Sequence, residues 1–397
     1  MKVLVTAVSF SSKISGVQRH AFNLVRCLLA HPDISAVHLV IAPWQREMAS
    51  NAGLGHDGRR LKIQVAELQP GSISRNLWHY RDLPKLANYL QPDLIHLTYP
   101  VPIDASALRC PVVLTLHDLY PYEIPANFRF PHVIFNRLAL RQCLRSADAI
   151  ACVSDATVQR LKRFAPERVW QKAVRIYNCV EPVSPRVARS PLSELNGKPF
   201  LLCVAQHRRN KNIPLLVRAF GALLSRGAIH AATNLVIVGI TGPETPNIHE
   251  IVAQRSLNRR VFFRDGLSDS ELQWCYERCD ALAVPSTTEG FGLPVAEGLL
   301  AGCRVICSNI PALREVGGEH CKYFALGRDE EVALAESITA SLKQPKPPAI
   351  ALPHLSAEAL GVEYVNLYRL VLEKSLAKAA SESDQNELRD SSALREV

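Results

Sequence analysis

The feature that most limits the fold of this chain is a repeated alternation of short apolar runs with longer amphipathic stretches. The runs are rich in Val, Ile and Leu and are too short for helices, whereas the intervening stretches carry apolar residues at helical spacing. The runs are residues 3–8, 37–41, 94–97, 112–116, 150–153 and 174–176, then 200–205, 235–238, 261–263, 281–284 and 304–307. This pattern predicts parallel sheets covered by helices on both faces, with ligands beyond the carboxyl ends of the strands.

A polar, proline-containing stretch from Glu181 to Pro199 divides the alternation into two halves. With 397 residues, 48% of them apolar, the chain can build two cores. We therefore expect an α/β protein of two doubly wound, Rossmann-like domains, over 1–182 and 183–350. Apolar residues at helical spacing predict a further helix over 351–373, which we expect to return to the first domain. The charged, serine-rich 374–397 predicts a disordered tail.

Composition narrows the class of protein. No run of about 18 uncharged apolar residues occurs, and the first residues lead directly into a strand-like stretch, so we expect a cytoplasmic protein without a membrane span. The eleven cysteines lie between Cys27 and Cys321 without a C-x-x-C pair, which favours reduced, buried thiols. No D-x-D pair is present to hold a divalent ion against a diphosphate, and we expect no metal.

The net charge of +9 lies in the first half of the chain. Residues 1–182 hold 22 Lys and Arg against 13 Asp and Glu, whereas the rest is balanced at 24 against 24. Nucleic-acid-binding signatures are missing, so the excess indicates either contact with an anionic membrane or acceptor, or a solvated basic face. Arg137, Arg141 and Arg145 are four apart and predict one basic helix face. Four more basic residues follow, Lys162, Arg163, Arg168 and Lys172.

The most informative stretch is 281–298. A strand is expected to end near Val284, a loop with two glycines follows, and Pro294 can begin a helix that Gly302 closes. The backbone N–H groups of 290–293 and the positive end of this helix then suit a diphosphate. Glu297, one turn into the helix, can accept hydrogen bonds from a ribose diol, and Glu289 can bind hydroxyls beyond the phosphates.

Glu289 and Glu297 are separated by seven residues in E-G-F-G-L-P-V-A-E, which resembles the E-x7-E signature of the retaining glycosyltransferase family four. Four further segments resemble motifs of that family in the same order. They are a glycine loop at 15–20, a His-Asp turn at 115–119, a phosphate-binding K-N loop at 204–212 and a helix at 308–316. The resemblance covers nearly the whole chain. It implies the GT-B fold, in which two Rossmann-like domains face each other across a cleft.

The resemblance also implies an activity and a set of site residues. The expected reaction is metal-independent transfer of a hexose from a nucleotide-diphosphate sugar to a glycan or lipid-linked acceptor, in polysaccharide synthesis, with retention of configuration. His117 and Glu289 would be catalytic. Donor contacts would come from Gly16, Arg208, Arg209, Lys211, Gly290, Phe291, Gly292, Leu293 and Glu297. The chain departs from the family pattern at Ala205, Gln206 and Cys179, which stand where a glycine, an arginine and a glycine are frequent.

The sequence is also compatible with other functions. Gly290-Phe291-Gly292 is half of a dinucleotide-binding G-x-G-x-x-G, but Val295 stands at its third glycine. A sugar-nucleotide epimerase or a phosphorylase would share the GT-B architecture. A sugar-nucleotide-binding subunit without catalysis is also compatible with the departures from the pattern. Turnover of a donor separates a transferase from a binding protein, and release of an epimerised sugar identifies an epimerase.

Overall fold

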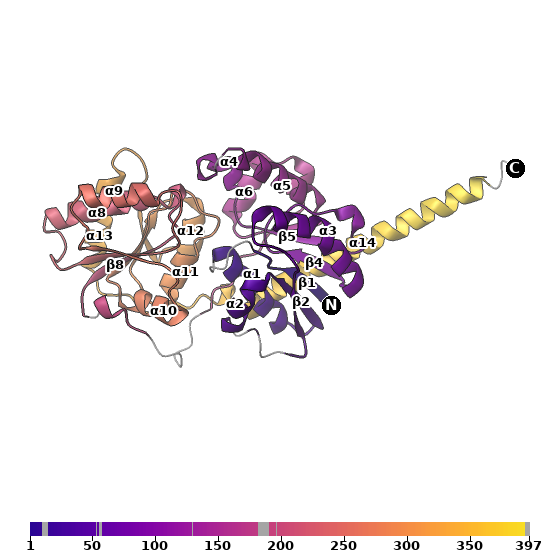
Figure 1. Ribbon diagram of the computed structural model, residues 1–397, viewed down its shortest axis with the longest axis horizontal. Helices are drawn as coiled ribbons and strands as arrows, with labels where there is room; N and C mark the ends of the chain where they lie inside the picture. The colour runs from indigo at the N-terminus through magenta and orange to yellow at the C-terminus, as the bar shows by residue number, and fades with distance from the viewer. Residues whose placement is uncertain are drawn as a thin grey trace.

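The computed structural model describes residues 1–9, 15–52, 54, 58–128, 130–181, 190–195 and 197–393. It contains two sheets, each with helices on both faces, which form two lobes (Figure 1). The strand orders are β3-β2-β1-β4-β5-β6-β7 and β10-β9-β8-β11-β12-β13. Neighbouring strands in both sheets are parallel. The expected α/β, GT-B-type architecture is confirmed, whereas the domain bounds stay predictions and the link over 182–189 and residue 196 lies outside the described residues.

The first sheet is built by residues 2–175. Its strands are β1 (Lys2–Thr6), β2 (Ala36–Ile41), β3 (Leu61–Val65), β4 (Leu94–Leu97), β5 (Val112–Leu116), β6 (Ala149–Cys152) and β7 (Ala173–Arg175). Its helices are α1 (Gly16–Ala30), α2 (Arg46–Asn51), α3 (Ser72–Leu90), α4 (Tyr120–Glu123), α5 (His132–Ser146), α6 (Asp155–Phe164) and α7 (Glu167–Trp170). The sequence pattern missed β3. This edge strand alternates apolar residues with exposed Lys62 and half-buried Gln64, so it contains no continuous apolar run.

The second sheet repeats this construction. Its strands are β8 (Phe200–Val204), β9 (Asn234–Val238), β10 (Val261–Arg264), β11 (Ala281–Val284), β12 (Val305–Ser308) and β13 (Cys321–Phe324). Its helices are α8 (Ile213–Ser225), α9 (Thr245–Gln254), α10 (Asp269–Arg278), α11 (Leu293–Leu300), α12 (Pro311–Gly317) and α13 (Glu330–Leu342). The missed strand β13 is again at a sheet edge, and its Lys322 is exposed.

Each sheet buries one apolar core on each face. In the first domain, α1 shares a core with β1, and α3 and α5 share another on the opposite face. In the second, α8, α9 and α13 cover one face, and α10, α11 and α12 cover the other. Val153, directly after β6, packs in the second domain's core together with Phe291. The carboxyl ends of the two sheets are therefore in contact around these two residues.

The last helix, α14 (Ala357–Ala393), lies against the first domain and then projects from it (Figure 1). Leu360, Tyr364 and Tyr368 are buried beside α1, and the Tyr368 hydroxyl lies 2.6 Å from Nδ1 of His96. The helix continues past Glu373, where a disordered tail was expected, as far as Ala393. The reason is local, since about half of residues 374–393 are Ala, Glu, Lys or Leu, which favour helices, and the segment contains no Gly or Pro to end one.

Two chemical expectations can be compared with this fold. All eleven cysteines are free thiols, and nine of them are buried, as the spacing predicted. In the described part of the chain, no helix combines the length and the apolar character needed to cross a membrane.

Candidate active site

An open cleft of about 290 Å³ lies between the carboxyl ends of the two sheets. Its lining brings together Gly16, His117, Arg208, Lys211, Glu289, Gly290, Phe291, Gly292, Leu293 and Glu297, from both domains. Of the residues that the sequence singled out, Arg209 is the exception. It is exposed and lies outside this lining, although its backbone N–H donates to Oδ1 of Asn127 in the first domain.

The donor loop, residues 285–292, connects β11 to α11. Gly292 has φ of 112°, a conformation that favours glycine, and α11 begins at the next residue with Pro294 in its first turn. Gly290 needs its lack of a side chain, because a Cβ there would lie 1.9 Å from the carbonyl oxygen of His117. Among the described residues, none accepts a hydrogen bond from the N–H groups of Gly290, Phe291 or Gly292. These groups and the helix end can bind an anion.

Glu289 precedes this loop and is almost fully buried, with 6% of its surface exposed. Its Oε1 accepts a hydrogen bond from Ser286 Oγ at 2.7 Å and lies 2.6 Å from the Lys211 ammonium. A carboxylate so far from water requires such partners, and the ion pair satisfies it. Lys211 therefore brings its positive charge to the cleft that Gly290 and Gly292 also line, where an ammonium can bind a phosphate.

Glu297 lies on α11, one turn beyond the loop. The hydroxyl of buried Tyr276 donates to its Oε2 at 2.6 Å, which fixes the carboxylate. Burial and the neighbouring Glu297 charge raise the pKa of Tyr276 well above its usual value, so the phenol remains a donor. Arg19, from α1 of the first domain, also lines the cleft and forms a 3.1 Å ion pair with Asp269 of the second.

His117 follows β5 and faces the donor loop from the first domain. Its Nε2 lies 2.9 Å from the carbonyl oxygen of Thr98, and a carbonyl can only accept, so Nε2 carries the proton and Nδ1 is the acceptor. Burial lowers the pKa of His117 to about 4, which keeps the ring neutral near pH 7. A neutral acceptor of this kind suits a sugar hydroxyl, which has a proton to donate.

The departures from the family pattern lie in or beside the cleft. Ala205 and Gln206 line it together with Arg208, so a guanidinium is present two residues after the position at which the family arginine is missing. Cys179 has no positive φ, and its backbone therefore does not require the glycine frequent at this position. Its carbonyl accepts a hydrogen bond from Asn23 of α1 at 2.8 Å.

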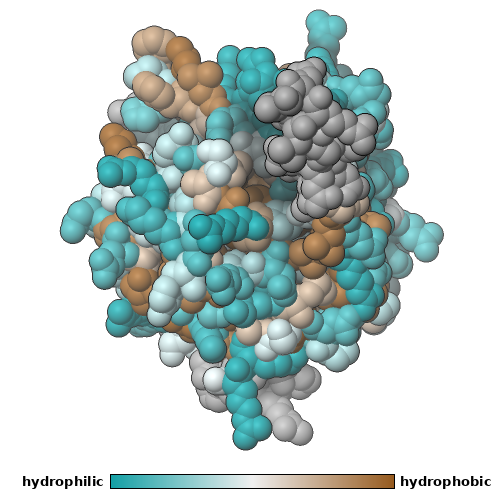
Figure 2. All heavy atoms as spheres, turned by 90° about the vertical axis from the view of Figure 1, so that its right-hand side faces the viewer, coloured by the Kyte–Doolittle hydropathy of each residue, from teal (hydrophilic) through white to brown (hydrophobic). Residues whose placement is uncertain are grey.

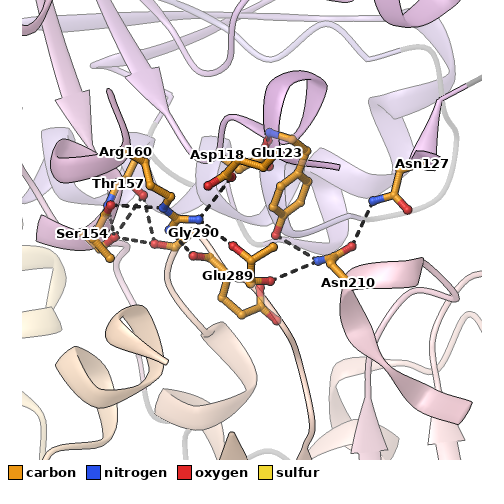
Figure 3. A network of polar contacts seen from close by, with 12 residues as sticks. Asp118, Glu123, Asn127, Ser154, Thr157, Arg160, Asn210, Glu289 and Gly290 are labelled. Atoms are coloured by element: carbon orange, nitrogen blue, oxygen red, sulfur yellow. Dashed lines mark hydrogen bonds and ion pairs between the residues drawn. The ribbon is translucent and has the colours of Figure 1, made fainter. Parts of the chain in front are cut away.

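Sequence analysis missed a set of first-domain side chains that hold the donor loop (Figure 3). Ser154, Thr157 and Arg160 donate to carbonyl or hydroxyl groups of residues 288–290. Asn210 of the second domain donates to the Tyr120 hydroxyl at 3.1 Å. The available signal was a serine suited to cap a helix, Ser154, directly after the predicted strand 150–153.

The predicted basic face of α5 is mixed in character. Arg141 and Arg145 are exposed, but Arg137 is half-buried because its Nε donates to the Pro121 carbonyl at 2.7 Å and its guanidinium covers the Tyr122 ring. Arg137 is therefore not part of the free basic face. Exposed apolar side chains share this surface, namely Phe130, Ile134, Phe135 and Leu138. Figure 2 shows a group of apolar side chains at the upper left, at the height at which Figure 1 places α4, α5 and α6.

Within the described residues, no group of three or more His, Cys, Asp or Glu side chains is arranged to hold a metal ion.

Two family models match consecutive parts of this chain. Residues 14–183 match the model described as Glycosyltransferase Family 4, and residues 187–351 match Glycosyl transferases group 1. Together they span nearly all of both domains and the whole cleft. The chain belongs to glycosyltransferase family four. It is therefore a glycosyltransferase.

Individual relatives of this glycosyltransferase agree with that assignment. It is 26% identical over 338 residues to O-antigen chain mannosyltransferase B of Escherichia coli, covering 80% of this chain and 85% of that protein. It is 28% identical over 251 residues to the serotype-specific mannosyltransferase WbdA of the same organism. That match covers 58% of this chain and 29% of WbdA.

Solved structures show the same fold. HepE of Anabaena, in complex with UDP-glucose, superposes with a TM-score of 0.64 at 17% identity, covering 95% of this chain and all of HepE. WaaG, a glycosyltransferase involved in lipopolysaccharide biosynthesis, superposes with a TM-score of 0.63 at 16% identity, covering 94% and 98% of the two chains. At these identities the likeness concerns the fold alone.

Proposed function

We propose that this glycosyltransferase transfers a hexose from a nucleotide-diphosphate sugar to a glycan or lipid-linked acceptor, with retention of the anomeric configuration. The observation that carries the proposal is the meeting in one interdomain cleft of Glu289, His117 and the donor-loop N–H groups, which have no acceptor in the part of the chain that the structure describes. The carboxylate of Glu289 and the neutral ring of His117 can accept hydrogen bonds from sugar hydroxyls. The N–H groups of the loop can bind the diphosphate. We propose that the product contributes to a cell-surface polysaccharide.

The roles of the residues follow from their positions along the cleft. Glu297 would accept hydrogen bonds from the ribose, and the loop N–H groups with Lys211 and Arg208 would bind the diphosphate. As the sugar leaves, negative charge grows on the β-phosphate, and these cationic and dipolar groups stabilise it without a metal. Glu289 would then hold hydroxyls of the sugar, opposite His117 Nδ1.

The relatives indicate which substrates to test first. Mannosyltransferases of O-antigen synthesis are among them, so mannose is the first sugar to test, and the HepE complexes make UDP the first nucleotide. A binding screen over nucleoside diphosphates, followed by one over sugar donors, identifies the pair that this cleft prefers.

Retention is tested by NMR of the first product formed, before any mutarotation. We expect the anomeric configuration of the donor in the product, and we expect His117→Ala to lower transfer more than donor binding, because the ring faces the sugar. An inverted anomeric centre contradicts the retaining mechanism. Unchanged transfer by His117→Ala contradicts the role of His117.

We further propose that the first domain rests on an anionic membrane surface at the inner face of the cell membrane. The exposed face of α5 combines apolar Ile134 and Leu138 with Arg141 and Arg145, one and two turns further along the helix. Apolar side chains can enter the headgroup region while arginines bind anionic lipids, each adding about 1 kcal/mol. Such contact would bring a lipid-linked acceptor to the cleft. A solvated face is the alternative.

A further inference from the structure

The carbonyl groups of the donor loop are held by the other domain. Ser154 caps α6 at the carboxyl end of β6, and its Oγ donates to the carbonyl oxygen of Gly290 at 2.5 Å. Thr157, in the first turn of α6, donates to the same oxygen at 3.2 Å. Both side chains are fully buried, and Figure 3 shows them beside Gly290. The Gly290 carbonyl therefore points into the first domain.

Arg160, one turn further along α6, holds the preceding peptide group. Its guanidinium donates to the carbonyl oxygen of Glu289 and, at 2.8 Å, to the hydroxyl of Thr288. The remaining donors reach the Ala156 carbonyl at 3.1 Å and the Glu123 carboxylate at 3.4 Å. With 17% of its side chain exposed, Arg160 is fixed at both ends of its planar fork.

The contact is reciprocal. Glu315 of α12, in the second domain, accepts hydrogen bonds from the backbone N–H groups of Asp155 at 2.7 Å and Ala156 at 3.2 Å. These are the first N–H groups of α6, which have no partner within the helix. The first turn of α6 is therefore held by α12 of the second domain, while Ser154 and Thr157 hold the donor loop, so that Arg160 has a defined position relative to the loop.

A peptide unit is planar and trans, so its C=O and its N–H point in opposite directions. Arg160 fixes the Glu289 carbonyl, and this sets the direction of the Gly290 N–H. Ser154 and Thr157 fix the Gly290 carbonyl, and this sets the direction of the Phe291 N–H. Side chains of Ser154 and α6 in the first domain therefore set the direction of two N–H groups that are available to a diphosphate, through the carbonyl groups on the opposite side of the same peptide units.

We infer that Arg160 is a positioning residue of the transfer reaction, which presents the Gly290 N–H and the Glu289 side chain to the donor. This inference rests on the proposed role of the donor loop. Arg160 itself contacts the carbonyl side of the peptide and not the anion-binding side. Its removal should therefore affect phosphate recognition and turnover while leaving nucleoside recognition by Glu297 unchanged.

The test compares Arg160→Ala with wild type by calorimetric titration of UDP and uridine, or of the nucleotide pair that the screen identifies. We expect the Kd of the nucleoside diphosphate to rise about tenfold, as for one charge-assisted hydrogen bond, and that of the nucleoside to stay unchanged. We expect kcat to fall about 100-fold, because a small misplacement of reacting groups has an effect of that size. The Kd and the kcat of Arg160→Lys should lie between those of wild type and Arg160→Ala.

Two variants serve as controls. Gln159→Ala changes an exposed neighbour on the same helix, and Glu123→Gln removes the ion pair of Arg160 while leaving its contacts with the loop. Both should keep nucleoside diphosphate affinity and kcat within about threefold of wild type, which is less than the loss of one hydrogen bond. A large loss in Glu123→Gln would show that the ion pair, not the loop contact, matters.

Amide NMR spectra of the donor loop test the inference without any ligand. We expect the Gly290 and Phe291 amide resonances to shift in Arg160→Ala and to stay in place in Gln159→Ala, because the direction of these N–H groups depends on the carbonyl groups that α6 holds. Unchanged Gly290 and Phe291 resonances in Arg160→Ala overturn the inference, as does equal loss of nucleoside and nucleoside diphosphate affinity. If wild type turned over no donor, the proposed function would fail, whereas the amide spectra would still decide the role of Arg160.

Discussion

Replacing Glu297 by alanine is expected to weaken nucleoside diphosphate binding by about 10- to 150-fold. The carboxylate has one oxygen held by Tyr276 at 2.6 Å, and in our proposal it accepts hydrogen bonds from the ribose. Hydrogen bonds to a charged group contribute about 1.5–3 kcal/mol, and about 1.4 kcal/mol corresponds to tenfold in affinity. Calorimetric titration measures this change directly. Glu289→Ala should instead lower turnover and leave this affinity nearly unchanged.

The structure also predicts a side effect of this substitution. Without Glu297, the buried Tyr276 hydroxyl loses its acceptor, which costs about 1–3 kcal/mol of folding free energy. Tyr276→Phe removes the hydroxyl and leaves the carboxylate, so it should keep most of the affinity. The double variant should recover stability relative to Glu297→Ala without recovering affinity. Wild-type affinity in a folded Glu297→Ala protein would refute the assignment of the ribose to this carboxylate.

Three other properties can be measured on the same protein. Burial lowers the pKa of fully buried His79 and His96 to about 3, against 6.5 when unfolded, so the unfolded chain binds more protons between these values. From pH 7.5 to pH 5 the free energy of unfolding, measured in urea, should therefore fall by about 2 kcal/mol for each, and His79→Gln should abolish its share. In vesicle sedimentation, wild type should bind anionic vesicles at low salt and release them at high salt, and replacing Arg141 and Arg145 by serine should weaken binding about 30-fold. Equal binding to neutral vesicles, or none to either, would contradict the membrane proposal. Transfer should be unchanged by EDTA, since Lys211, Arg208 and the loop N–H groups take the role of a cation; an EDTA-dependent loss restored by Mg²⁺ would show otherwise.

Much of the fold follows from the sequence because most strands are buried on both faces. Such strands appear as continuous apolar runs, and the two that were missed, β3 and β13, are edge strands with exposed lysines. The extent of α14 was misjudged for a different reason. Charge and serine content suggested disorder, but the helix propensity of the segment favours continuation to Ala393.

The local geometry of residues 281–298 could also be foreseen, because its parts are adjacent in the chain. A strand, two glycines, a proline and Glu297 within one short segment define a local geometry. The contribution of α6 could not be foreseen in the same way. Ser154, Thr157 and Arg160 act on backbone carbonyls about 130 residues away, and such contacts leave no residue pattern in the partner segment.

The most direct test of the central claim is sugar transfer itself. Wild-type protein is incubated with a panel of nucleotide-diphosphate sugars, mannose donors first, together with glycan and lipid-linked acceptors, and the acceptors are examined by mass spectrometry. The account predicts addition of one hexose from one preferred donor, and a loss of turnover in Glu289→Gln with retained nucleoside diphosphate binding. Release of a free epimerised sugar, binding without turnover, or full activity of Glu289→Gln would contradict it.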